Sequence, residues 1–120
     1  MLYAVDINTG KQRWQFGAKG YGLSNPTINS ETVYVAGLGG LYALDIPTGS
    51  VKWTAIINGS LNSDPAADSR AVYVGGNDGK FYAFDALTGV KKWEFKTGGS
   101  TISSLCVVDS DDKTHGVFAR

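Results

Sequence analysis

Short runs of β-branched and aromatic residues, separated by turn signals, follow one another along the chain. Val72–Val74 and Phe81–Phe84 are typical of these runs, and such residues favour strands. Neither run alternates apolar with polar residues, as a strand with one wet face would. Turn signals such as Asn77–Gly79 and Gly39-Gly40 separate the runs, and no apolar period of 3.6 persists. The pattern therefore predicts an all-β fold of short strands that are buried on both faces.

One sequence unit recurs three times, and its tryptophans lie 39 and 40 residues apart. The unit reads Ala-x-Asp-x-x-Thr-Gly-x-x-x-Trp. We expect its aspartates to accept hydrogen bonds from turn amides and its glycines to supply the positive φ that tight hairpins need. A period near 40 residues indicates a repeat architecture. The recurring residues are Ala4, Asp6, Thr9, Gly10 and Trp14, then Ala43, Asp45, Thr48, Gly49 and Trp53, then Ala83, Asp85, Thr88, Gly89 and Trp93.

A second block recurs between the copies of the first. It begins with Ser24-Asn25-Pro26 in one copy and with Ser63-Asp64-Pro65 in the next, and a β-type run follows each time. The third copy is degraded, because Cys106 stands where the prolines stand. Each repeat thus holds four short β-type runs. Small antiparallel sheets that are buried on both faces and repeat every 40 residues are what stacked propeller blades require.

The repeated unit resembles the tryptophan-docking motif of β-propellers built from pyrroloquinoline quinone (PQQ)-type repeats. The resemblance spans the chain and weakens after about residue 108. It implies four-stranded antiparallel blades in which each tryptophan docks onto a neighbouring blade. The motif therefore marks the fold rather than a cofactor site. On this basis the chain is predicted to be a β-propeller fragment of about three PQQ-like repeats.

The same resemblance sets the expected register. It implies an outer half-blade over 1–17, blades over about 23–57 and 62–97, and an inner half-blade over 102–120. Propellers close with about 4–8 blades, so we expect one partial propeller that the remainder of the propeller or further copies of the chain would complete. Because exposed apolar blade faces associate, the isolated chain is expected to be poorly soluble or to associate irregularly, with a closed dimer as a minor form.

Composition narrows the function classes. Eleven basic residues balance eleven acidic ones, which argues against a nucleic-acid binder. The only basic cluster, Lys91, Lys92 and Lys96, is interpreted as a solvated outer edge. No apolar run is long enough to span a membrane, and the first residues lack the features of a signal peptide. The single cysteine excludes an intrachain disulfide.

The sequence offers no constellation of catalytic groups. His115 is the only histidine, and the acidic run Asp109–Asp112 is interpreted as a hairpin loop rather than a cation site. The repeat is also similar to that of PQQ-dependent dehydrogenases, which typically have an adjacent pair of cysteines and a set of Glu, Asn and Asp ligands for the quinone and Ca²⁺. No residues here match that set. We therefore expect no catalytic, cofactor-binding or metal-binding residues and no cofactor.

These observations favour a non-catalytic binding or scaffold module whose partner is another protein. It resembles the propeller lipoproteins of bacterial outer-membrane barrel assembly, which implies the cell envelope and a periplasmic or extracellular location. Two alternatives stay open: a fragment of a PQQ- and Ca-dependent alcohol or sugar dehydrogenase, and an accessory propeller on a larger enzyme or kinase. Fold alone does not choose among them.

Overall fold

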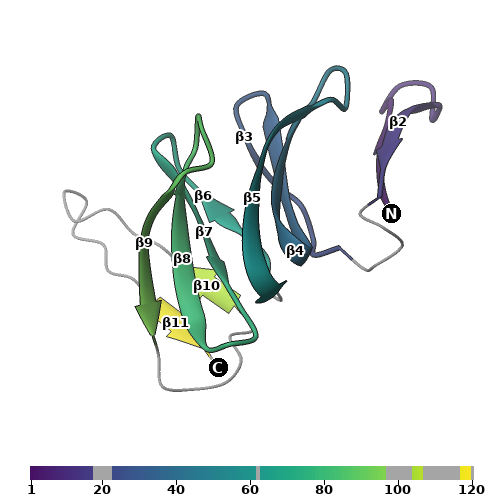
Figure 1. The fold of residues 1–120 in the computed structure, drawn as a ribbon. Coiled ribbons are helices and arrows are strands. Elements are labelled where there is room, and N and C mark those ends of the chain that lie inside the picture. The colour runs from purple at the N-terminus through teal and green to yellow at the C-terminus, as the bar shows by residue number, and fades with distance from the viewer. Residues whose placement is uncertain (18–22, 62, 97–103, 107–116, 120) are drawn as a thin grey trace.

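Within the part of the chain that the structure describes, four antiparallel sheets succeed one another (Figure 1). The computed structural model describes residues 1–17, 23–61, 63–96, 104–106 and 117–119, and within these ranges every regular element is a strand. Accordingly, no helix among the described residues is long and apolar enough to cross a membrane. The predicted all-β propeller architecture is confirmed.

The strands have the following bounds. The first sheet pairs β1 (Leu2–Val5) with β2 (Gln12–Phe16), and the second has the order β3 (Thr27–Asn29), β4 (Thr32–Asp45), β5 (Val51–Ser60). The third has the order β6 (Ala66–Ala67), β7 (Ala71–Gly75), β8 (Lys80–Asp85), β9 (Lys91–Lys96), and the last pairs β10 (Ser104–Cys106) with β11 (Val117–Ala119).

The β4 strand departs from the expected pattern, because it runs through Gly39 and Gly40 without a break. Both glycines have positive φ, 88° and 158°. The Ile46 amide donates to the Glu31 carbonyl, as the Ala86 amide donates to the carbonyl of Arg70 in the next sheet. The β4 strand therefore folds back on itself at the two glycines. Its first half corresponds to β7 of the third sheet, and its second half corresponds to β8.

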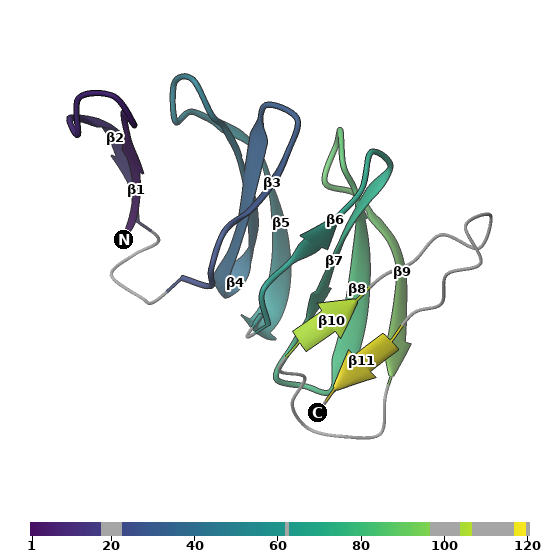
Figure 2. The same cartoon turned by 180° about the vertical axis from the view of Figure 1, so that it is seen from behind.

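The core lies between the second and third sheets, which stand side by side in both views (Figures 1 and 2). Val72 and Val74 are fully buried, and so is Leu41 of the facing sheet. The β7 and β8 strands are buried along most of their length, as their lack of alternation predicted. In contrast, every residue of the edge strand β9 is exposed, including the lysines interpreted as a solvated outer edge.

Polar contacts join the two central sheets where β3 and β6 begin. The Asn25 amide and side-chain Nδ2 donate to the two carboxylate oxygens of Asp64 at 2.9 and 3.2 Å. The Thr27 hydroxyl donates to the Pro65 carbonyl. Because these residues belong to the two Ser-x-Pro blocks or follow them directly, the second repeated block joins successive sheets.

Candidate functional site

The repeated aspartates fix the hairpin turns. Asp85 Oδ1 accepts from the amides of Leu87 and Thr88 at 2.9 and 3.1 Å. These two backbone hydrogen bonds hold the pKa of the Asp85 carboxyl below its ordinary value. Asp6 accepts from its own turn amides in the same way, with the same lowering of its pKa. Asp45 accepts instead from the amide and hydroxyl of Thr48, at 3.2 and 2.7 Å.

Each of the first two motif tryptophans contacts the turn of the following repeat. Trp14 Nε1 donates to the Ile46 carbonyl at 2.7 Å, and Trp53 Nε1 donates to the Ala86 carbonyl at 3.0 Å. The indole covers the turn so closely that a Cβ on Gly49 would lie 2.6 Å from ring atoms of Trp14. A buried indole N–H needs an acceptor, and here the acceptor is supplied by the neighbouring repeat.

The motif alanine and the motif tryptophan of each copy are cross-strand neighbours. They stand opposite the tryptophans in strand register, with the pairs Ala4↔Trp14, Ala43↔Trp53 and Ala83↔Trp93. The motif threonines lie in the turns, where the Thr88 hydroxyl accepts from the Val90 amide at 3.3 Å. The structure thus brings all five residue types of each copy together at one hairpin, and it joins successive hairpins through the indole.

The outermost copies of the motif lack this contact within the part of the chain that the structure describes. Trp93 is 48% exposed, whereas Trp53 is 9% exposed. A Cβ on Gly10 would meet nothing within 4 Å, and Ile7 in the same turn is 95% exposed. The last copy of the motif therefore presents a half-exposed indole, and the first copy presents an uncovered turn.

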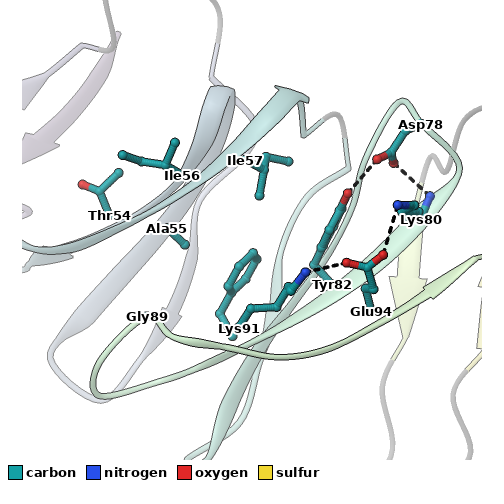
Figure 3. Close-up of a pocket in the computed structure, with 11 residues that line it drawn as sticks. Thr54, Ala55, Ile56, Ile57, Asp78, Lys80, Tyr82, Gly89, Lys91 and Glu94 are labelled. Atoms are coloured by element: carbon teal, nitrogen blue, oxygen red, sulfur yellow. Dashed lines mark hydrogen bonds and ion pairs between the residues drawn. The ribbon is translucent and has the colours of Figure 1, made fainter.

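A cleft of about 430 Å³ opens between the second and third sheets. Its walls are β5 on one side and β8 and β9 on the other (Figure 3). The Tyr82 hydroxyl donates to Asp78 Oδ2 at 2.6 Å. Burial and this hydrogen bond raise the pKa of the Tyr82 hydroxyl, so it stays protonated as a donor at neutral pH.

Two lysines share one carboxylate at the rim of this cleft. Glu94 lies 3.0 Å from Lys80 Nζ and 2.5 Å from Lys91 Nζ. Hydrogen bonds from Lys91 and then Lys80 hold the pKa of the Glu94 carboxyl below its ordinary value, and Glu94 raises the pKa of Lys80. These contacts therefore favour the charged forms of Glu94 and Lys80, and Figure 3 shows the lysine and carboxylate groups directed at one another.

Comparison with known proteins identifies the family. The family model described as outer membrane protein assembly factor BamB, a PQQ-type repeat family, matches residues 1–116. The chain belongs to this BamB family. BamB from Moraxella catarrhalis is 31% identical, with a TM-score of 0.74 over 89% of this chain, and the chain spans 34% of that BamB.

Other solved structures share the same fold. A quinohemoprotein alcohol dehydrogenase from Comamonas testosteroni is 28% identical, with a TM-score of 0.63 over 72% of this chain and 16% of its own. The computationally designed Ika4 protein, 17% identical, has a TM-score of 0.81 over 98% of this chain and 79% of its own. Among curated proteins, nothing matches. The predicted kinship with PQQ-type propellers and quinoproteins is confirmed.

The cleft residues of this BamB-family chain were not anticipated from the sequence, where Lys91 was interpreted only as an edge lysine. The sequence signal that could have revealed them is a difference between repeats, because Asp78, Lys80 and Glu94 have uncharged counterparts in the second repeat. Asp109–Asp112 and His115 lie outside the described residues, and only the backbone of Cys106 is described. Among the residues described, no group of three His, Cys, Asp or Glu side chains could hold a metal ion.

Proposed function

We propose that this chain is part of a non-catalytic propeller that binds and positions other proteins in the cell envelope. The observation that carries the proposal is the match of residues 1–116 to the family of an outer membrane protein assembly factor, together with 31% identity to a BamB. Assembly in the outer membrane acts on proteins, so the partner is a protein.

The roles of the repeated residues support a scaffold. We propose that all fifteen motif residues are structural, because turn hydrogen bonds occupy the motif carboxylates and, in the first two copies, a carbonyl of the following turn occupies the indole N–H. We further propose that the chain comprises an outer half-blade over 1–17, blades over 23–57 and 62–97, and an inner half-blade over 102–120. Under this division, binding belongs to the outer surfaces and to the spaces between blades.

A fragment of a quinone-dependent dehydrogenase is the second candidate. The observation in its favour is the 28% identity to a quinohemoprotein alcohol dehydrogenase over 72% of this chain. A dehydrogenase needs residues that hold the quinone and its cation, and the motif aspartates and the first two motif tryptophans already have other partners. The scaffold is therefore preferred.

Two measurements separate the candidates, one on the purified chain and one in cells. With added PQQ, Ca²⁺ and either ethanol or glucose, we expect no saturable change in quinone absorbance and no reduction of a redox dye. With a photo-crosslinking residue at Ile56, which is 83% exposed beside the cleft, expression in the envelope of a Gram-negative bacterium should give discrete adducts with components of the outer-membrane assembly machinery. Dye reduction that requires both quinone and Ca²⁺ would establish the dehydrogenase instead.

A further inference from the structure

The β5 strand has one backbone edge that no other described strand pairs with. It is the last strand of the second sheet, and its only partner there is β4. With ten residues it is the longest of the three strands that follow a motif turn, since β2 has five and β9 has six. A free edge offers a row of N–H and C=O groups to another strand. It is therefore either blocked by local features or available to a partner.

Two features that blunt a sheet edge are common to all three of these strands. The register of each pairing shifts just after the motif alanine, and such a bulge twists the edge. Each strand also has a basic residue before its tryptophan: Arg13, Lys52 or Lys92. Lys52 Nζ donates to the Thr32 hydroxyl at 2.6 Å, so this charge lies over β4 rather than over the free edge of β5. What distinguishes β5 must lie at other positions.

The strands differ on the face that is turned away from the following sheet. In β5, Ala55 points toward the third sheet and Ile56 points away from it (Figure 3). The outer strand of the third sheet has charged residues on this face, and a charged edge discourages pairing with another strand. In strand register, Lys91, Glu94 and Lys96 of β9 correspond to Val51, Thr54 and Ile56 of β5.

The corresponding residues of β5 are exposed and carry no charge. Ile56 is 83% exposed and Val51 is 49% exposed, and Thr54 is exposed as well. All three are β-branched residues, which favour strand pairing. In β2 the same face has Gln12 and Gln15, whose side chains are hydrogen-bonded to each other at 3.5 Å. The β5 strand therefore combines the longest free edge with the face best suited to a further strand.

We propose that the free edge of β5, over residues 51–57, pairs with an extended, uncharged segment of a partner polypeptide, which adds a strand to the second sheet. The proposal rests on the proposed function only in taking the partner to be another protein. The main chain of an extended polypeptide matches a row of unpaired N–H and C=O groups. Side chains of the added strand beside Val51 and Ile56 should be β-branched or apolar, because such cross-strand pairs stabilise a sheet.

Hydrogen exchange of the dilute chain, followed by mass spectrometry, tests this pairing. The probe is acetyl-Lys-Thr-Val-Thr-Val-Thr-Lys-amide, an uncharged strand with a lysine at each end for solubility. In its control, Pro-Pro replaces the central Thr-Val pair, which removes N–H donors from both edges of the peptide. We expect the probe to slow exchange over residues 51–57 in a saturable way and to leave residues 91–96 unchanged. The proline peptide should have no effect.

Charges copied from β9 should block the edge. The double variant Val51→Lys, Thr54→Glu places the lysine and glutamate of β9 at the same register on β5. Because both positions are exposed, its melting temperature should stay within about 4 °C of the wild type, while protection by the peptide is lost. The matched control, Gln12→Lys with Gln15→Glu, places the same charges on β2 and should respond like the wild type.

Several results would overturn the proposal. These are no saturable protection at millimolar peptide, equal protection by the proline peptide, or unchanged protection of the β5 double variant. Protection of β5 that rises with protein concentration alone would assign the edge to a second copy instead. Should the double variant unfold, Ile56→Lys, which copies Lys96, must weaken the protection. Envelope crosslinks at Ile56 that persist unchanged in the double variant would leave the scaffold function standing and remove the β5 edge from it.

Discussion

The tryptophan indole and the glycine of the following turn form a contact that is made twice in the described chain. Trp14 covers Gly49 and Trp53 covers Gly89, and each indole N–H donates to a carbonyl in the covered turn. The contact combines a large apolar surface with one directional hydrogen bond, and glycine permits it because a side chain would occupy the same space. Its free energy therefore depends on both partners being present.

Removal of the three tryptophans in turn should give unequal losses of stability. We expect Trp53→Ala to destabilise the protein by about 3–5 kcal/mol, as for other buried aromatic truncations, because Trp53 is 9% exposed. Trp14→Ala should cost less, since Trp14 is only partly buried. Trp93→Ala should cost about 1 kcal/mol or less, since Trp93 is 48% exposed. Thermal unfolding measures the series, and equal shifts for Trp14 and Trp53 would contradict the assigned register.

The charge of Asp85 should make stability depend on pH in the acid range. Its folded-state pKa is lowered by two turn amides, so its contribution is fully present above the unfolded-state pKa of about 4 and is lost as pH falls through the folded-state pKa. Asp85→Asn retains the accepting oxygen and removes the charge.

We therefore expect the melting temperature of Asp85→Asn to fall less than that of the wild type between pH 5 and pH 2. The comparison is made by thermal unfolding across that range. Parallel curves for the two proteins would show that the carboxylate charge contributes nothing to the turn.

At the scale of strands and hairpins, much of the architecture could be predicted because the repeated unit acts locally. An Asp-x-x-Thr-Gly turn is specified by its own residues, so its position follows from the sequence alone. The continuous path of β4 was not predicted, because Gly39-Gly40 is also a turn signal and only the paired strand β5 shows how the bend is accommodated. The cleft was missed because it depends on Ala55 facing Tyr82, two residues from different repeats.

The junction between sheets can be tested with a matched pair of glycine substitutions. Gly89 and Gly10 have nearly the same φ, +77° and +73°, but a Cβ on Gly89 would lie 2.6 Å from a ring atom of Trp53, whereas one on Gly10 would meet nothing. Alanine at either position carries the left-handed strain of about 1 kcal/mol.

Gly89→Ala should therefore lower the melting temperature well beyond Gly10→Ala, and it should shift tryptophan fluorescence as the indole is displaced. Gly10→Ala should leave the fluorescence unchanged. If the two variants lose the same stability, the indole does not rest on the turn.

On the scale of the whole molecule, the first and last copies of the motif leave exposed surfaces that match each other. The uncovered turn at Ile7 and Gly10 has the form that receives an indole in the inner repeats, and Trp93 is the uncovered indole. Such a contact is heterologous, and copies joined by it form rings only if the rotation closes. Repeat arrays cap such ends with polar residues, whereas Trp93 and Phe95 are about half exposed.

Light scattering of the isolated 120-residue chain across a range of concentrations tests the central claim most directly. If successive blades join by indole-to-turn contacts, and the turn at Gly10 and the indole of Trp93 are available to a second chain, the average mass should rise with concentration well above the 12.7 kDa of one chain. Trp93→Ala, which removes the uncovered indole, should reduce that rise. A stable monomer of 12.7 kDa at every concentration, for both proteins, would contradict the account.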